Sequence, residues 1–414
     1  MRTISRRRFL QLSALTGSTL LMGDLANRII GSTRNQQLAH AAEPIKIGII
    51  DPLTGPYKTS SIHDVHGANV AVDLFNKRGG VIGRPVVILE GDDASNPEQA
   101  VQVATKFIKE DRVDALMGTF NGECALAVSA LAQKENKLFM VTGASIPELS
   151  GSSCNLQTFV FMPNAPMMAN AVAPYLVKAY GTRWSMITAD NMDGKAMAQA
   201  MSTASQAHNV ELVGEIMMPF GSTDFSSVLE EAKKKEPTAI ILNIYGWDLV
   251  HALRGYTKLG LAKDKIGVGG MLGGEQIGRP LGYANNAGIW GLIWDPKIQT
   301  EGSKRFIQAV IDKYNHTPTS RCYLGYAAMT QILEAMERAG STDTPALIKT
   351  LAGHEFDGLK TGKSVFQASN HQHVQDVLVG EAYGKELGLG HYKILATAAG
   401  ESALGTHADT SCKL

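Results

Sequence analysis

The sequence predicts an α/β protein of two lobes, each built on a parallel sheet covered by helices. From Ile45 onward, short runs rich in Val and Ile alternate with amphipathic stretches, which indicates strand and helix units in alternation. The strand-like runs are apolar throughout, as in sheets buried on both faces. The alternation starts again after residue 164, and 414 residues exceed what one core usually supports. We therefore expect two lobes.

The first lobe is expected to contain four strands before residue 150. They are predicted at 45–51, 85–93, 113–118 and 138–143. The stretch "HGANVAVDLFNKRGG" (66–80) carries apolar residues at helical spacing and ends in two glycines. Ser95 or Asn96, followed by Pro97, predicts the start of a second helix, because these residue types favour the N-cap and first helical positions. A third helix is expected at 123–135.

The second lobe and the end of the chain continue the pattern. A strand-like run at 159–164 leads into it, further strands are expected at 184–189, 211–217, 239–246, 266–272 and 287–294, and helices near 165–180, 194–208, 225–235 and 247–259. After these, the periodicity predicts helices at 301–315, 320–339 and 344–352, and strands in "SVFQA" (364–368) and "VQDVLVGEAY" (374–383).

The first 41 residues are predicted to be an export signal. They hold six arginines and one acidic residue, with an arginine triplet before an apolar stretch and the small-residue triplet 39–41 at the end. The segment "SRRRFL" (5–10) resembles a twin-arginine signal, which the export machinery reads as an address. The apolar stretch is interrupted by polar residues and is too poor for a membrane span. We expect the mature chain to begin near Ala42 and to reside in the periplasm.

The remaining chain has 33 basic and 38 acidic side chains, a net charge of −5, once the signal is subtracted from the 39 of each kind. This balance argues against nucleic acid as a partner. The four cysteines lack the spacing of a redox or zinc motif. We predict a disulfide between Cys154, in a polar loop, and Cys412, near the end of the chain, while Cys124 and Cys322 stay free and buried.

The chain shows no recognisable catalytic set, and we expect no enzyme activity and no cofactor or metal. Asp92 and Asp93 are read as turn and capping residues. The pair His63 and His66, and the segment "HQH" (371–373), could each supply two metal ligands. A surface-loop role is favoured for both, because no third ligand is identifiable from the sequence.

Ligands of open parallel sheets bind at the carboxyl ends of the strands. Polar and aromatic residues gather in the turns after the predicted strands, where two facing lobes would form a cleft. The candidates are Tyr57, Asn121, Glu123, Ser145, Asp193, Tyr245, Trp247 and Glu275. Together they predict a cleft for a small solute that pairs an apolar or planar body with a donor or cationic group.

The chain after the signal resembles, along its whole length, type I periplasmic solute-binding proteins of the branched-chain amino acid (leucine-binding protein-like) group of ABC transporters. The resemblance rests on "IKIGIIDPLTGPY", "GANVAVDLFNKRGGVIGRPVVILEGDDASNPEQA", "GTFNGECALAVSALA", "TGASIPEL" and "HQHVQDVLVGEA", in this order and spacing. It implies two Rossmann-like lobes joined by a three-strand hinge. The implied boundaries are 42–163 with 295–370 for the first lobe and 164–294 with 371–414 for the second lobe and tail.

The resemblance also implies roles for single residues. The ligand carboxylate would meet the turn Asn121–Glu123, which includes Gly122, and the turn with Ala144 and Ser145, while Glu275 would hold its ammonium group. Gly122 stands where a serine is usual and Asp193 where a tyrosine is usual. Because Glu123 adds a negative charge beside this turn, leucine itself is a doubtful ligand.

The function that follows is that of a periplasmic receptor in an ABC importer. It would capture an amino acid-like, amide or aromatic solute and deliver it to permease subunits in the inner membrane. The twin-arginine export machinery would be a further partner. Two alternatives stay open: a sensory ligand-binding protein and a cofactor-dependent periplasmic enzyme.

Overall fold

The computed structural model describes residues 43–384, 390–404 and 411–414, which belong to one compact unit that begins at Glu43. The predicted export signal lies outside the described residues. None of the helices described is long and apolar enough to cross a membrane.

The first sheet has the strand order β2-β1-β3-β4-β5, and all its pairings are parallel. Its strands are β1 (Ile45–Asp51), β2 (Val86–Asp92), β3 (Ala115–Gly118), β4 (Phe139–Val141) and β5 (Thr158–Val160). Its helices are α2 (Lys58–Lys77), α3 (Pro97–Lys109) and α4 (Gly122–Lys134), with the short η1 (Pro147–Ser150) and, from late in the chain, α10 (Glu301–Tyr314), α11 (Ser320–Ala339) and α12 (Thr344–Leu351).

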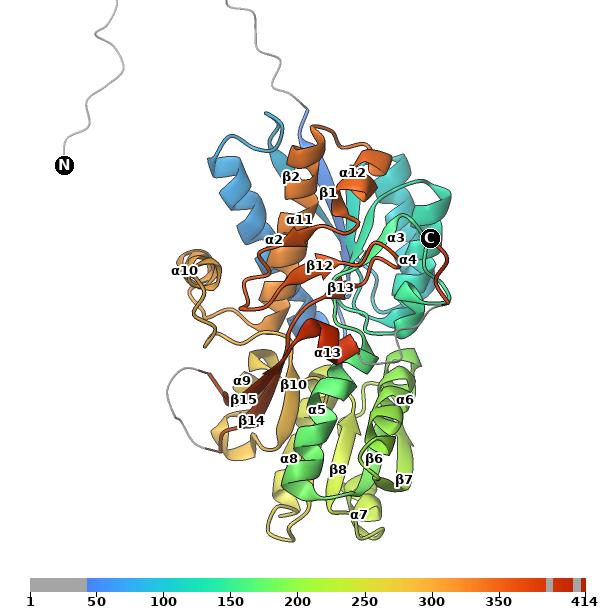
Figure 1. Ribbon diagram of the computed structural model, residues 1–414, viewed down its shortest axis with the longest axis vertical. Helices are drawn as coiled ribbons and strands as arrows, with labels where there is room; N and C mark the ends of the chain where they lie inside the picture. The colour runs from blue at the N-terminus through green and yellow to red at the C-terminus, as the bar shows by residue number, and fades with distance from the viewer. Residues whose placement is uncertain (1–42, 385–389, 405–410) are drawn as a thin grey trace, which may run out of the picture. The chain divides into compact units, whose positions relative to one another are not determined.

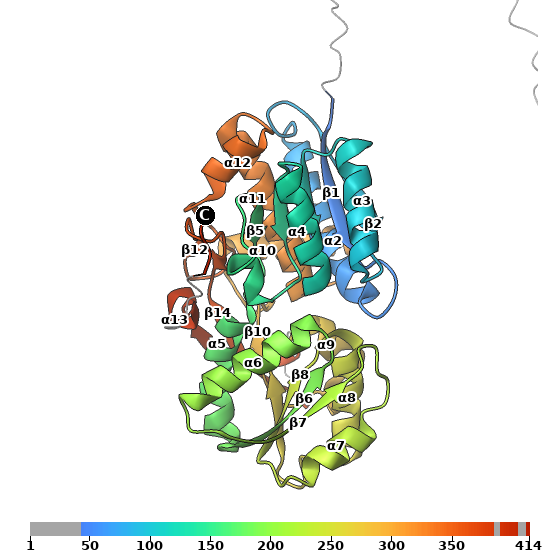
Figure 2. The same cartoon turned by 90° about the vertical axis from the view of Figure 1, so that its right-hand side faces the viewer.

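Helices cover both faces of this first sheet. Ile45, Ile47 and Ile49 of β1 belong to the core shared with α2 and α11, whereas Ile50 belongs to the core shared with α3 and α4. The alternation follows from the two-residue period of a strand. Figures 1 and 2 show α2 and α11 side by side, with α3 and α4 together on the other side of the sheet.

The second sheet has the order β15-β14-β10-β9-β8-β6-β7, with β14 and β15 antiparallel to their neighbours. Its strands are β6 (Arg183–Ala189), β7 (Glu211–Met218), β8 (Ala239–Asn243), β9 (Gly267–Gly270), β10 (Ile289–Leu292), β14 (Val377–Ala382) and β15 (Tyr392–Ala398). Its helices are α5 (Ala165–Tyr180), α6 (Met192–Gln206), α7 (Ser226–Lys233), α8 (Gly246–Lys258), α9 (Glu275–Leu281), η2 (Tyr283–Asn285) and α13 (Gly400–Leu404).

A small third sheet, β11-β12-β13, is formed by the chain between α12 and β14. It consists of β11 (Glu355–Phe356), β12 (Ser364–Phe366) and β13 (His373–Val374). The chain passes between the large sheets in three segments, at 161–164, 293–300 and 367–376. The first and third are tied together, because Gln372 Nε2 donates to the carbonyl of Met162 at 2.9 Å and Gln375 Nε2 donates to that of Phe161 at 3.1 Å.

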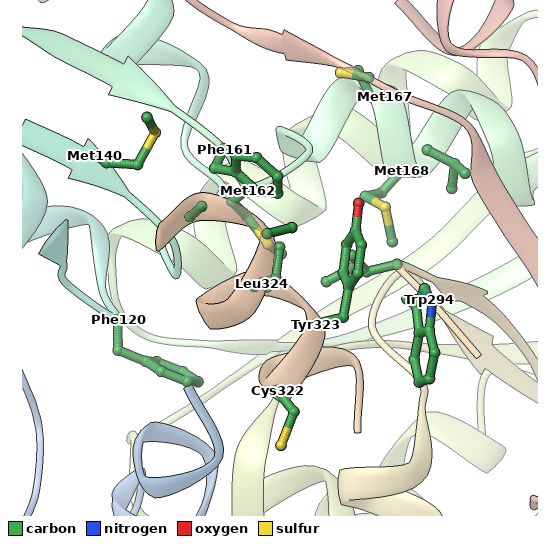
Figure 3. Packing of buried hydrophobic residues seen from close by; sticks show 14 of the residues in the cluster. Phe120, Met140, Phe161, Met162, Met167, Met168, Trp294, Cys322, Tyr323 and Leu324 are labelled. Atoms are coloured by element: carbon green, nitrogen blue, oxygen red, sulfur yellow. The ribbon is translucent and has the colours of Figure 1, made fainter. Parts of the chain in front are cut away.

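One buried core continues through these passages (Figure 3). It joins Phe161 and Met162 of the first passage, Trp294 of the second, Met168 of α5 and Tyr323 of α11. Trp294 stacks on Tyr323 with ring centroids 6.1 Å apart. The two lobes therefore share packed side chains at the crossing segments as well as covalent connections.

The structure differs from the sequence-based expectation at the start of α2. This helix begins at Lys58, not at His66. The intervening residues include serines, a histidine and an aspartate, which have low intrinsic helix propensity, and Tyr57 at the N-cap makes no side-chain cap hydrogen bond. Packing of α2 against α11 extends the helix where local propensity gives no signal. Ser60 and His63 are helical as a result.

The surface-loop interpretation of the "HQH" segment is wrong. His371 and His373 are buried, with 1% and 0% of their surface exposed. His371 stacks on Phe159 at 3.9 Å, and His373 Nδ1 lies 3.2 Å from the carbonyl oxygen of Phe161. These histidines are packing residues of the crossing segments.

The cysteines divide into one bridge and two thiols. Cys154 and Cys412 form a disulfide that spans 258 residues of sequence, and Cys124 and Cys322 are free and buried. The bridge attaches the end of the chain to the loop between η1 and β5.

Candidate functional site

A cavity lies where the carboxyl ends of the two sheets face each other. Both lobes contribute to its wall. Its lining residues are Ser60, Phe120, Gly143, Ser145 and Arg321 from the first lobe, Asp193, Tyr245, Gly246, Leu272, Gln276 and Ile277 from the second, and Met162 and Ile293 from the crossing segments. The centre of a water-sized sphere can move through about 40 Å³, room for a few waters at on the order of 10–15 Å³ each. As the lobes are placed, the cavity has room for a small solute only.

Asp193 of α6 reaches from the second lobe to the first. Its Oδ2 accepts a hydrogen bond from the backbone N–H of Gly122 at 2.7 Å, and its Oδ1 lies 3.5 Å from the N–H of Ser145. Glu123 makes the reverse connection, since its Oε1 accepts from the N–H of Met192 at 2.9 Å. Two carboxylates, one from each lobe, thus bind backbone donors of the opposite lobe at helix N-termini, where negative charge is favoured.

Burial raises the pKa of Asp193 from its usual 3.8 to about 7, while the Gly122 hydrogen bond works in the other direction and the nearby Glu123 adds to the rise. Only 3% of its surface is exposed. The protonation state of Asp193 therefore changes near neutral pH.

An aromatic stack crosses the cleft beside the cavity. Tyr57 of the first lobe lies between Phe120 of its own lobe, at 4.5 Å, and Phe220 of the second lobe, at 4.4 Å. It also stacks on Tyr245 of the second lobe at 5.2 Å, and the Tyr245 hydroxyl accepts from Asn191 Nδ2 at 2.9 Å. Stacked pairs of this kind add about 0.5–1.5 kcal/mol each beyond their buried area, so this stack favours contact between the lobes.

Arg321, near the start of α11, places a buried cation in the cavity wall. Its side chain lies over the Phe120 ring at 4.5 Å, and its Nη1 donates to the carbonyl of Thr142 at 3.1 Å. Its Nη2 lies 3.5 Å from Asp64 Oδ2, but within the described part of the chain neither Nη2 nor Nε makes an aligned hydrogen bond. A buried donor left without an acceptor costs about 1–3 kcal/mol. Arg321 thus places a positive charge in the cavity wall, with two guanidinium N–H groups that are buried and poorly satisfied by the protein.

Asp64 and Asp51 set the charge behind Arg321. Burial raises the pKa of both carboxyls, that of Asp51 strongly, with the neighbouring Asp64 adding to its rise. Asp64 also accepts a hydrogen bond from the Thr142 hydroxyl at 2.6 Å. Of these two carboxyls, Asp64 lies within ion-pair distance of Arg321.

Three of the residues expected from the sequence line the cavity: Ser145, Asp193 and Tyr245. Gly122 and Glu123 lie in the contact between the lobes, and Tyr57 lies in the stack beside the cavity. Asn121 caps α4 by accepting from the N–H of Cys124 at 2.9 Å, and Ala144 is buried in the core with α4. Trp247 Nε1 donates to Thr59 Oγ1 at 3.4 Å, outside the cavity wall.

Glu275, the expected partner of an ammonium group, already has protein partners. It accepts from the backbone N–H of His391 at 2.7 Å, its Oε2 lies 2.9 Å from His391 Nδ1, and Arg279 lies 3.6 Å away. Burial alone would raise the pKa of Glu275. The hydrogen bonds from His391 and the charge of Arg279 outweigh this effect and bring the pKa below its usual value. Glu275 ties α9 to the start of β15 and is not among the cavity-lining residues.

The sequence reasoning missed Arg321, Phe120, Ser60 and Gln276. Ser60 and Arg321 lie on helices, whereas the search was confined to turns after strands. Arg321 did carry a signal, because a single arginine stands in the otherwise apolar start of "SRCYLGYAAM" (320–329). A charged residue on the buried side of a helix is rare unless it is paired or functional.

The fold and the cavity define a two-lobed α/β binding protein, and comparison with known proteins identifies its family. The chain belongs to the periplasmic binding protein family, whose sequence profile matches residues 44–386. The Leu/Ile/Val-binding protein BraC3 of Rhizobium johnstonii is 26% identical over 357 residues, which cover 82% of this chain and 89% of that protein. The Leu/Ile/Val/Thr-binding protein of Salmonella typhimurium is 24% identical over 350 residues, which cover 83% of this chain and 91% of that protein.

Solved structures share the fold at lower identity. The substrate-binding protein of an amino acid ABC transporter from Pseudomonas fluorescens Pf-5 superposes with a TM-score of 0.83 at 22% identity, over 90% of this chain and all of that one. A solute-binding protein from Rhodopseudomonas palustris BisB5, solved with 3,4-dihydroxybenzoic acid, superposes with a TM-score of 0.79 at 18% identity. The match covers 86% of this chain and 98% of that one. These comparisons confirm the predicted fold class and the family suggested by the resemblance.

Proposed function

We propose that this protein is the periplasmic substrate-binding component of an ABC importer and encloses a small organic solute between its two lobes. The observation that carries the proposal is the cavity, whose wall comes from both lobes and holds a buried arginine with unused donors. A relative named as a Leu/Ile/Val-binding protein supports the same role. The partners would be permease subunits in the inner membrane.

The chemistry of the wall favours a compact solute with an acceptor and a donor close together. Arg321 would donate to a carbonyl or carboxylate oxygen, and Asp193 would accept from an N–H or O–H group. Met162, Leu272 and Ile293 supply apolar surface. An amide meets both polar requirements without adding a charge near Asp193, so we place amides ahead of amino acids and aromatic acids.

Calorimetry of the mature protein against small amides, amino acids and aromatic acids tests the solute class. We expect an amide to bind tightest, and Arg321→Met to weaken its binding by about 2–4 kcal/mol, since truncating one partner of a buried charged hydrogen bond costs that much. Arg338→Met, on the exposed end of the same helix, is the control and should bind as wild type. If a carboxylic acid binds tightest the amide preference is wrong, and if no panel member binds through Arg321 the cavity is not the site.

Export through the twin-arginine route is part of the proposal. The arginine triplet and the small residues before Ala42 support it. Arg6→Lys with Arg7→Lys should prevent periplasmic accumulation, as measured by fractionation and blotting. Normal accumulation of this double variant would contradict the route while leaving the receptor role untouched.

The lobe boundaries and the hinge are proposed in the same way. We infer that the lobes comprise 42–163 with 295–370, and 164–294 with 371–414, and that the segments between the large sheets act as the hinge. The hydrogen bonds of Gln372 and Gln375 to the first passage support a common hinge, because they tie two passages into one unit.

A further inference from the structure

A cluster of three histidines lies on the first lobe, apart from the residues that line the cavity. His63 and His66 are one helical turn apart on α2, and His316 lies in the loop between α10 and α11. One ring nitrogen from each can be chosen so that all three lie within 4.8 Å of one another. All three side chains are partly exposed, so an ion from solvent can reach them.

We propose that His63, His66 and His316 form a binding site for a divalent transition metal ion such as Zn²⁺. The proposal concerns a different part of the molecule from the solute cavity and does not rest on the proposed function.

The spacing of the ring nitrogens fits a metal centre. Nitrogens about 2.0–2.1 Å from a tetrahedral ion lie roughly 3.4 Å apart, and His316 Nε2 lies 3.5 Å from His66 Nδ1. The His63 ring centroid is 5.2 Å from that of His316 and 5.9 Å from that of His66, with both pairs close to perpendicular. Small rotations of the rings would bring the third nitrogen into the coordination sphere.

The surroundings orient His316 for this role. Its Nδ1 lies 3.0 Å from the carbonyl oxygen of Thr317, to which it can donate. That bond leaves the Nε2 lone pair directed toward His66, and metal-binding histidines usually donate their other ring N–H to such an acceptor. His66 is held by stacking on Tyr314, with ring centroids 3.8 Å apart. The rings are thus positioned before an ion binds.

Two of the three histidines, His63 and His66, have pKa values below the usual value of 6.5. Burial lowers the pKa of His63 to about 3 and that of His66 to about 4, with the neighbouring imidazoles adding to the effect. Cys322 Sγ lies 3.5 Å from His63 Nδ1, and burial raises the pKa of its thiol to about 11. Three imidazole ligands suit zinc, copper or nickel better than calcium or magnesium, which prefer oxygen ligands.

Nearby cations are compensated and do not prevent binding. Lys313 pairs with Asp73 at 2.7 Å, and Arg279 lies 3.6 Å from Glu275 while its Nη2 donates to the Thr317 carbonyl at 2.6 Å. Lys313 and Arg279 therefore each have a carboxylate within ion-pair distance.

Zinc titration of tag-free, chelator-treated mature protein tests the site. Calorimetry and native mass spectrometry should show one Zn²⁺ per chain, with no comparable binding of Mg²⁺ or Ca²⁺. We expect His63→Ala, His66→Ala and His316→Ala each to weaken binding at least about tenfold, since even outer-shell changes at metal sites cost 10–100-fold. His208→Ala, at a histidine outside the cluster, should bind as wild type.

X-ray absorption of the zinc-loaded wild type provides a readout that needs no variant. Scattering from three imidazole rings is expected. A first shell of oxygen alone, the absence of saturable binding, or variants that bind zinc as wild type does would each overturn the proposal.

Discussion

Asp193 shows how a single residue changes what this fold can bind. The resemblance implies that the turn Asn121–Glu123 and Ser145 receive a ligand carboxylate, but here a carboxylate of the protein itself reaches both backbone donors. Gly122 makes this approach possible, because a Cβ at Gly122 would lie 2.8 Å from Ile146 Cγ2 and 3.3 Å from Asp193 Oδ2. The two departures from the family pattern are therefore physically coupled. Together they connect the two lobes at this turn.

The titration of Asp193 predicts a pH dependence. Burial raises the pKa of Asp193 in the folded protein above its value of 3.8 in the unfolded chain. Protonated Asp193 therefore stabilises the folded protein fully below about pH 4, and this stabilisation is lost as the pH rises to about 7. At about 1.4 kcal/mol for each unit of pKa difference, the loss is at most about 4 kcal/mol. Asp193→Asn, which stays neutral, should flatten the decline of unfolding free energy between pH 5 and pH 8.

Chemical denaturation at several pH values measures this effect. Asp190→Asn is a suitable control, since Asp190 is exposed and pairs with Lys195 at the surface. A parallel pH dependence for wild type and Asp193→Asn would show that Asp193 is solvated or does not titrate in this range.

At the scale of elements, the disulfide gives a direct prediction. Cys154 and Cys412 enclose 258 residues of sequence, and closing such a loop stabilises by about 2–5 kcal/mol in the chain-entropy account. Cys412→Ser should therefore lower the melting temperature of oxidised protein, and denatured wild type should show two reactive thiols. Reducing agent should bring wild type to the level of the variant; four thiols in unreduced wild type would exclude the bridge.

Helices with a strong periodicity of apolar residues were predictable from the sequence. Helical segments that form only because they pack against other elements were not. The periodicity gave α5 and α11 with the same bounds as the structure, because each carries a long apolar stripe and a capping residue. The first two turns of α2 and the short α9 lack such a pattern, so the sequence does not indicate that Ser60, His63 and Gln276 are helical. His316 could not be joined to His66 from the sequence, since 250 residues separate them and only the packing of α10 and α11 against α2 brings them together.

At the scale of the whole molecule, solute binding should depend on contacts between the lobes in which the solute takes no part. The stack of Tyr57 on Phe220 joins the lobes, yet neither residue is among those that line the cavity. A contact made only in the closed form shifts the equilibrium between open and closed forms, and the apparent affinity falls with the population of the competent form. We therefore expect Phe220 to contribute to affinity through closure and not through contact with the solute.

Phe220→Ala should weaken solute binding by about 1–2 kcal/mol, on the scale of a lost aromatic pair and its buried area. Calorimetry with the solute found for wild type gives the affinity, and small-angle scattering without solute should show a larger mean radius for the variant. Met217→Ala is the control, because Met217 lies on β7 only three residues away and is 40% exposed. If Phe220→Ala keeps both the wild-type affinity and the wild-type radius, the stack of Tyr57 on Phe220 does not govern closure, and the other contacts between the lobes, such as those of Asp193 and Glu123, are sufficient for it.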